Sequence, residues 1–285
     1  MKAILQEGHF KRLKIVQGDR VILGLCLGDY RESYLLQRPV VHPFYTPLGF
    51  PVTEMGAHNT PHHRGVWVGH AQLSGINFFH EGEGTGWIVP TEWEVEEADE
   101  NLRIRMQLEW RDPRGTVIAT EERHYDLNQE QDVHILDVIS ALAPVGGDMR
   151  MEPDMHAFMG MRVLDAIDED DGGQMTSSEG GIGEAEISWE KTGQAVRWVN
   201  YSGTLGGHHV GLAALVHPKL SPMPAYAREY GTVFLNPTAD RVVEVPEDEM
   251  FPFAARFVAY DGVLSDERLD NLWESFGDAS LLGNS

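Results

Sequence analysis

The amino-acid sequence predicts an all-β fold, a large antiparallel β-sandwich with one C-terminal helix. Between residues 93 and 143, apolar and polar residues alternate with the period of two that is typical of strands with one buried face. Elsewhere, short apolar runs are separated by Gly and Pro at the positions where turns are expected. Only residues 264–277 carry a clear helical pattern.

In the first part of the chain, residues 9–30 are expected to form a β-hairpin. Residues 31–57 contain four prolines, so we expect this segment to wrap around the sheets without pairing. Residues 65–70 are expected to form a strand. Because side chains alternate across a strand, Trp67 and His70 would then lie on opposite faces.

In the second part, the alternating segment turns back on itself at Gly115 and predicts a β-meander. Residues 168–186 are acidic and rich in glycine, which indicates a surface loop. The further strands that we expect are 196–201, 210–216, 232–235 and 253–260.

The helix at the end of the chain has recognisable start and stop signals. Ser265 is a good N-cap, and the two acidic residues after it suit the positive end of the helix dipole. Gly277 can close the helix. The apolar residues at helical spacing are Leu269, Leu272, Trp273 and Phe276. We therefore expect one face of this helix to pack on the sandwich.

Length and composition indicate one domain. The chain has 285 residues, no internal repeats and no low-complexity linker, so a single β-sandwich domain over residues 1–285 is expected, with helix 264–277 packed on it. The single cysteine, Cys26, excludes an internal disulfide and a cysteine-cluster metal site.

The charge of the chain restricts its partners. It has 45 acidic and 22 basic side chains, a net charge of −23, whereas nucleic acids and anionic membrane surfaces require basic patches. We expect neither as a partner. No apolar run approaches the roughly 18 residues of a membrane span, and the N-terminus does not resemble a signal peptide. A cytoplasmic location is expected, and the sequence leaves homo-oligomers open.

The candidate site is organised around a histidine-rich stretch that begins at His58 and ends at His80. Five of the 13 histidines lie in it. Histidine can donate or accept a proton near neutral pH, and each ring has nitrogens that need partners when buried. We interpret the stretch as the floor of a polar pocket. The alternative is that individual histidines cap turns and bond to the backbone.

Acid–base catalysis needs a proton donor and a proton acceptor on opposite sides of one reacting carbon. The catalytic candidates are His62, His63, His70, His156, His217 and Glu152. Glu179 is better explained as a solvated loop residue. Three ligands drawn from His62, His63, His156, His217 and Glu152 could hold a divalent metal ion, although no motif spacing supports this. The sequence has no nucleotide-binding glycine signature, so apart from a possible metal ion no cofactor is indicated. It also has no element that would suggest a serine nucleophile.

Several segments, taken together in order, resemble a bacterial family labelled methane oxygenase PmoA-like. The matching pieces are His42-Pro43, Pro47–Gly49, Val52–Glu54, Pro61–Gly65 with Trp67 and His70, Gly75–Phe78, Trp198–Gly203, His217-Pro218, Arg228–Gly231, Asn236-Pro237 and Tyr260–Gly262. The resemblance implies a galactose-mutarotase-like supersandwich and a role in carbohydrate metabolism, with a small-molecule carbohydrate as partner. The pattern departs after Pro218, where Tyr226 would take the place of an aromatic ring of the relatives.

A sugar site needs planar hydrogen-bonding groups and an exposed aromatic ring. On this basis the candidate substrate-binding residues are Arg64, Trp67, Asn77, Tyr226, Arg228 and Glu229. Each has an ordinary alternative. Trp67 can be a core residue, Arg64 can pair with a carboxylate such as Glu54 or Glu152, and Glu229 can pair with Arg228.

Three functions remain open from the sequence. The leading hypothesis is a carbohydrate-active enzyme that uses histidine and carboxylate chemistry on a sugar or glycoside. An oxidised keto-sugar is favoured as substrate, and the reaction would be elimination, hydrolysis or isomerisation. The others are an aldose mutarotase or epimerase and a non-catalytic sugar-binding protein. The fold alone does not separate them.

Overall fold

The strands form two large antiparallel sheets. The computed structural model describes residues 1–8, 11–28, 36–57, 60–130 and 132–283, and within these residues each large sheet has eight strands. In spatial order, the first sheet contains β1 (Lys2–Glu7), β2 (Lys11–Gln17), β3 (Arg20–Gly28), β4 (Val40–Phe44), β5 (Val66–His70), β11 (Ala157–Arg162), β16 (Thr232–Leu235) and β15 (Ala225–Arg228). The second contains β12 (Gln174–Ser177), β13 (Trp198–Leu205), β14 (His208–Val216), β18 (Phe251–Asp261), β9 (Val133–Pro144), β8 (Val117–Gln129), β7 (Asn101–Arg111) and β6 (Trp87–Glu97).

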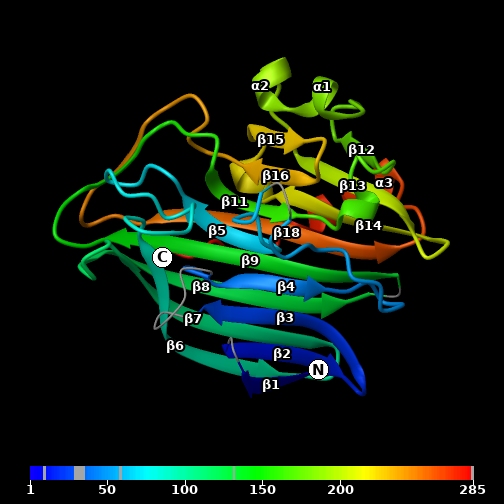
Figure 1. Ribbon diagram of the computed structural model, residues 1–285, viewed down its shortest axis with the longest axis horizontal. Coiled ribbons are helices and arrows are strands. Elements are labelled where there is room, and N and C mark those ends of the chain that lie inside the picture. Colours follow the sequence, from blue (N-terminus) through cyan, green and yellow to red (C-terminus); the bar gives the residue numbers. More distant parts are fainter. Residues whose placement is uncertain (9–10, 29–35, 58–59, 131, 284–285) are drawn as a thin grey trace.

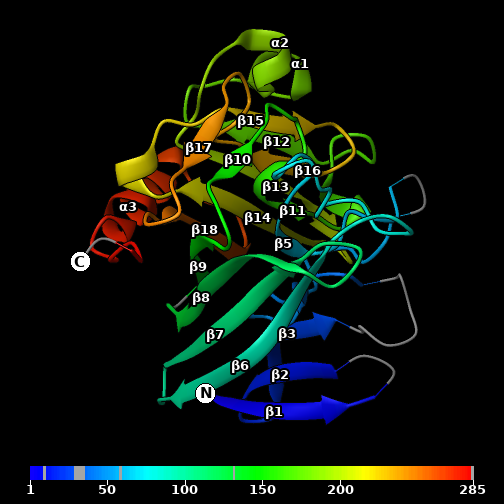
Figure 2. The same cartoon turned by 90° about the vertical axis from the view of Figure 1, so that its left-hand side faces the viewer.

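The remaining elements lie outside the two sheets. β10 (Met149–Met151) pairs with β17 (Val243–Val245) in a small ribbon. The short helices α1 (Glu184–Ile187) and α2 (Trp189–Thr192) lie next to β15, at the opposite end of the molecule from β1 and β6 (Figures 1 and 2). Helix α3 (Asp266–Phe276) lies on the outer side of the second sheet.

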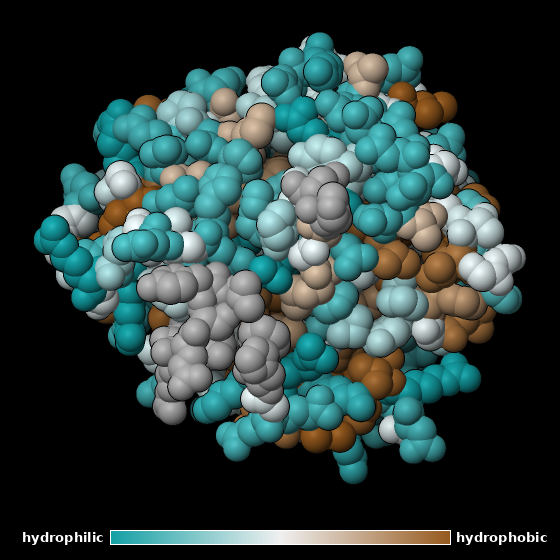
Figure 3. Space-filling view, in the orientation of Figure 1, coloured by the Kyte–Doolittle hydropathy of each residue, from teal (hydrophilic) through white to brown (hydrophobic). Residues whose placement is uncertain are grey.

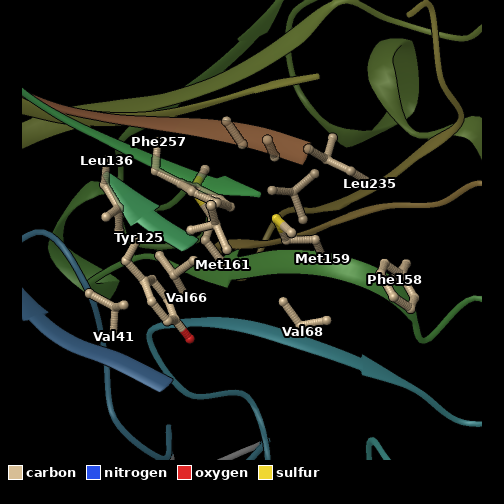
Figure 4. Packing of buried hydrophobic residues seen from close by; sticks show 14 of the residues in the cluster. Val41, Val66, Val68, Tyr125, Leu136, Phe158, Met159, Met161, Leu235 and Phe257 are labelled. Carbon is tan, nitrogen blue, oxygen red and sulfur yellow. The ribbon is translucent and has the colours of Figure 1, made fainter. Parts of the chain in front are cut away.

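The main core fills the space between the sheets because residues alternate along each strand. On β5, Val66 and Val68 point inward, and on β11 so do Met159 and Met161. They face side chains of the second sheet such as Phe257, and all of these residues are fully buried (Figure 4).

Each sheet also has a covered outer face. Leu269 and Leu272 of α3 pack with Trp198 on the outside of the second sheet. On the outside of the first sheet, a separate apolar cluster includes Trp67 and Phe234, from the alternate positions of β5 and β16. The candidate site is built on this second cluster, on the other side of the sandwich from α3.

The predicted fold class is confirmed. The meander corresponds to β6–β9, the hairpin to β2 and β3, and the C-terminal helix is capped by Ser265, whose Oγ accepts from the backbone N–H of Arg268 at 3.2 Å. The other expected strands correspond to β5, β13, β14, β16 and β18.

Three local predictions were wrong or incomplete. Residues 31–57 were expected not to pair, but β4 forms between β3 and β5. It does so although it contains Pro43, and the peptide bond between His42 and Pro43 is cis. Strand β1 was not predicted, because most of its residues are exposed at the sheet edge and show no alternation of buried and exposed positions. Residues 168–186, expected to be a loop, include β12.

The surface agrees with the acidic composition. The face shown in Figure 3 is mainly hydrophilic, and hydrophobic residues gather on the right of the view and near its lower edge. Among the described residues, no helix has both the length and the apolar character needed to cross a membrane.

Candidate functional site

Four histidine rings meet on the outer face of the first sheet. The ring centroid of His62 lies 4.5 Å from that of His63 and 4.8 Å from that of His80, and His80 lies 4.7 Å from His156. Phe79 packs beneath them, stacked on His156 at 5.1 Å. Segments far apart in the sequence therefore converge here, because β5 pairs antiparallel with β11 and this places the residues that follow β5 beside those that precede β11. His58 lies outside the described residues.

The side chain of Asn77 orients His80. Asn77 Oδ1 accepts hydrogen bonds from the backbone N–H groups of Phe79 and His80, at 3.0 and 2.9 Å. The amide nitrogen is then left to donate to His80 Nδ1 at 3.0 Å, so neutral His80 carries its proton on Nε2. Burial lowers the pKa of His80, and the nearby His156 lowers it further. His80 is thus a neutral hydrogen-bond donor at physiological pH.

Asp154 orients His156 in the opposite sense. Asp154 Oδ1 accepts from the backbone N–H of His156 at 2.8 Å and from its Nδ1 at 2.9 Å. Burial acts to raise the pKa of Asp154, but the hydrogen bonds from His156 outweigh it, and the pKa is lowered. The carboxylate is therefore ionised and fixes the tautomer that leaves a lone pair on His156 Nε2. The two side chains are 24% and 22% exposed, so this pair is open to a small molecule.

His63 and Trp67 form the layer below. His63 Nδ1 lies 3.0 Å from the hydroxyl of Thr232, and its ring stacks between Trp67 and Tyr230 at 5.8 and 6.0 Å. Burial, followed by the neighbouring His62, lowers the pKa of His63 to about 2. Trp67 is only 1% exposed, so it is a core tryptophan, and the prediction of an exposed sugar-stacking ring at this position does not hold. Both faces of β5 are covered, which the sequence did not indicate.

A partly buried ion pair lies beside the histidines. Arg64 forks onto Glu81, with Nε and Nη2 each 2.9 Å from Oε2, and not onto Glu54 or Glu152 as expected. Burial raises the pKa of Glu81, and the positive charges of Arg38 and Arg64 partly offset this effect. Arg64 is therefore committed to a carboxylate of the protein.

Two predicted catalytic histidines are structural. His70 is fully buried, its Nδ1 accepts from the backbone N–H of Gln72 at 2.9 Å, and its Nε2 donates to Thr238 Oγ1 at 3.0 Å. Both of its nitrogens are occupied. His217 lies near the end of α3 on the other side of the sandwich, where its Nε2 donates to the carbonyl of Ala279 at 3.0 Å. His217 therefore helps to hold the segment after α3 against the second sheet.

The remaining predicted residues surround the cluster at a distance. Glu152 pairs with Arg150 at 2.5 Å near β10. Arg228 pairs with Glu184 and Glu190 of α1 and α2, at 3.0 and 2.7 Å.

Glu229 and Tyr226 differ in their exposure. Glu229 is exposed, and its backbone N–H donates to Glu184 Oε2. Tyr226 is nearly buried and packs in the same apolar cluster as Trp67.

The predicted metal ligands are not assembled. Within the described part of the chain, no group of three or more His, Cys, Asp or Glu side chains is arranged to hold a metal ion. His217 and Glu152 lie away from the cluster, and neutral His80 presents a proton rather than a lone pair at Nε2.

Two residues of the site, Asp154 and His80, were not among the candidates predicted from the sequence. Asp154 precedes His156 by two positions, and this short spacing between an acidic residue and a histidine was an available signal. His80 was part of the histidine-rich stretch but was not selected as a candidate. Its role appears only when Asn77 and His156 are seen beside it.

Solved structures with a similar strand arrangement include several carbohydrate-related proteins. A crystallised α-galactosidase from Lactobacillus brevis is 10% identical with a TM-score of 0.42, covering 95% of this chain and 41% of the other. A galactose mutarotase-like protein from Lactobacillus casei is 6% identical with a TM-score of 0.38, covering 91% of this chain and 100% of the other. A putative aldose 1-epimerase from Escherichia coli is 11% identical with a TM-score of 0.35, covering 91% and 98%. This chain spans less than half the length of the α-galactosidase, and at these scores the likeness says nothing about its activity.

Sequence comparisons give a family and no function. No curated protein matches the chain significantly. A family model described as a family of unknown function, DUF6807, matches residues 12–274, which is nearly the whole chain, and it gives no support to the PmoA-like label. The chain belongs to the DUF6807 family.

Proposed function

We propose that this protein is a carbohydrate-active enzyme in which two imidazoles share the proton transfers, with His156 as the base and His80 as the hydrogen-bond donor. The observation that carries the proposal is that these two rings have opposite hydrogen-bonding roles at Nε2. Asp154 leaves an acceptor at His156 Nε2, Asn77 leaves a donor at His80 Nε2, and the ring centroids are 4.7 Å apart. The carbohydrate class rests on the sequence resemblance.

This arrangement favours substrates in which a C–H bond lies next to a carbonyl group. In such a substrate, His156 Nε2 removes the proton, the C–H electrons form a C=C bond, and the carbonyl electron pair moves to oxygen. The oxygen then accepts a hydrogen bond from His80 Nε2–H, the kind of stabilisation that a positioned donor gives to developing charge. A proton delivered to the opposite face of the same carbon epimerises the sugar. In an elimination, the oxygen electron pair instead re-forms the C=O bond, the C=C bond shifts to the next carbon, and the group on that carbon leaves with its bonding electrons.

Direct cleavage of an ordinary glycoside is less well served. It usually needs two carboxyl groups, one of them protonated to donate to the leaving oxygen. Here Asp154 is held ionised by His156, and Glu81 is paired with Arg64. The pKa of His62 is lowered to about 4, by burial and then by His80, so at neutral pH this ring is unprotonated and cannot act as the general acid. A keto-sugar is therefore the favoured substrate.

The test is exchange of carbon-bound hydrogen for deuterium in D₂O, followed by NMR. The probes are methyl glucosides that carry a single ketone at one ring position or another. We expect exchange or elimination with at least one probe, and a loss of about a hundredfold or more in His156→Gln and His80→Gln. The matched control is His209→Gln, because His209 is exposed and donates to the carbonyl of Gly262 far from the cluster. Unchanged rates in both site variants would contradict the proposal.

The alternative of an aldose mutarotase or epimerase uses the same donor and acceptor, since ring opening of a hemiacetal also needs one of each. Polarimetry on unmodified aldoses separates the two functions, because mutarotation proceeds without exchange of carbon-bound hydrogen. A protein that binds these sugars in calorimetry and changes neither observable would be a binding module.

A further inference from the structure

A buried arginine joins the two loops that carry His62 and His80. Arg38 is 1% exposed and precedes β4. Its Nη2 donates to the backbone carbonyl of His62 at 2.7 Å, and its Nη1 donates to the backbone carbonyl of Phe79. The second carbonyl belongs to the peptide unit whose nitrogen is that of His80. One planar group therefore ties together the two peptide units next to these rings.

The packing around Arg38 fixes its plane. Its guanidinium carbon lies 4.8 Å from the centroid of the Phe79 ring, and Glu81 Oε1 lies 3.7 Å from Nη1. Glu81 is in turn bound by Arg64. An arginine, a carboxylate and a second arginine thus form a nearly buried row across three segments of the chain.

Burying these charged side chains costs free energy of desolvation. Buried ion pairs are often replaceable by apolar side chains at no loss of stability, because desolvation of the charges cancels much of their attraction. A guanidinium nevertheless offers something that no apolar side chain does, two N–H donors at a fixed separation and angle. At Arg38 both of these donors are used on the backbone of the candidate site.

We propose that Arg38 is a positioning residue that sets the separation of His62 and His80. The inference goes beyond the proposed function and does not depend on which reaction the site performs. If it is right, loss of the two hydrogen bonds lets the loops at residues 60–64 and 77–81 move apart, while the sheets remain intact because Arg38 packs on Phe79, which belongs to the outer cluster and not to the main core between the sheets.

Two substitutions separate geometry from charge. The ring of His62 faces the rings of His63, His80 and Phe79. Burial lowers the pKa of His62 most, followed by His80. The other groups that lower this pKa are Arg38, His156 and Arg64. Arg38→Lys keeps the positive charge but loses the second donor of the fork. Arg38→Met loses both.

The experiment uses the full chain with labelled histidine and needs no substrate. NMR would measure the proton contact between the rings of His62 and His80, together with the pH midpoint of His62. We expect Arg38→Lys to lose the contact and to raise the midpoint from about 4 by roughly one pH unit, since a ring in a looser site is better solvated. Arg38→Met should raise it further.

The matched control is Arg256→Lys. Arg256 is also buried and also binds a carboxylate, Asp137, through two nitrogens, but it lies in the second sheet under α3. It should lower the thermal midpoint without changing the His62 contact or its titration. If Arg38→Lys folds and leaves both observables at the wild-type values, Arg38 does not position the histidines. Arg38→Lys decides the matter even if Arg38→Met does not fold. A missing sugar activity leaves this test unaffected.

Discussion

A fully buried ion pair between the sheets offers the sharpest test of how the site is supported. Glu121 accepts hydrogen bonds from Arg123 Nε and Nη2, both at 2.6 Å, from Trp110 Nε1 at 2.7 Å and from Ser140 Oγ at 2.6 Å. Both charged side chains are 0% exposed. Trp110 in turn packs against the rings next to the site, with Phe78 at 4.9 Å. Every acceptor position of the carboxylate is therefore in use.

Glu121→Ala should be strongly destabilising. It leaves the Arg123 charge buried without a partner, which typically costs about 3–5 kcal/mol. The whole free energy of unfolding of a domain is about 5–15 kcal/mol. For a chain of this length the loss corresponds to a fall in the thermal midpoint on the order of 10 °C. Urea unfolding followed by circular dichroism would measure the free energy, and calorimetry the midpoint.

The double variant Glu121→Met with Arg123→Met tests the reasoning. Removing both charges removes the unpaired one, so at least half of the loss should be recovered. Asp126→Asn is the matched control, because Asp126 pairs with Arg103 on the same strands but at the surface and should cost about 1 kcal/mol or less. A Glu121→Ala variant within about 1 kcal/mol of the wild type, or a double variant no better than the single one, would refute the account.

Three further outcomes are expected. Asp154→Asn removes the carboxylate that orients His156, so turnover in the deuterium-exchange assay should fall about a hundredfold with the thermal midpoint nearly unchanged, and a wild-type rate would exclude this role. Burial lowers the pKa of His70 to about 4, whereas the pKa of a histidine in the unfolded chain is about 6.5. Between these two pH values the unfolded chain binds a proton at His70 and the folded chain does not. The free energy of unfolding therefore decreases as the pH falls from about 6.5 to about 4. His70→Gln should reduce the slope of stability against pH in that window by about 1.4 kcal/mol per pH unit, whereas an unchanged slope would contradict the assignment. Gly65→Ala would place Cβ 2.0 Å from a backbone oxygen and should lower the free energy of unfolding in urea by at least about 2 kcal/mol. Gly49 also has a positive φ but has open space around it, so Gly49→Ala should lower this free energy by about 1 kcal/mol. Equal losses in the two variants would contradict the steric argument.

Local sequence patterns were sufficient to predict the class of fold and the part of the chain in which the candidate site lies. The alternation from Leu102 to Trp110 marks strands with one buried face, and the cap at Ser265 marks the start of the helix, because both signals lie within a few residues of the positions they describe. The dense histidines before His80 likewise marked a region that needs polar partners.

The contacts of those residues could not be predicted from local patterns, because they depend on which distant segments pack together. Periodicity does not reveal that the second face of β5 is also covered, so Trp67 is buried where an open ring was expected. His156 joins His62 and His80 only because β11 pairs with β5, and Glu81 and Arg38 become partners across more than 40 residues of sequence. Hydrogen-bond partners and ion pairs are set by which distant segments touch, and it is these contacts that made His156 an acceptor, His80 a donor and His70 a structural residue.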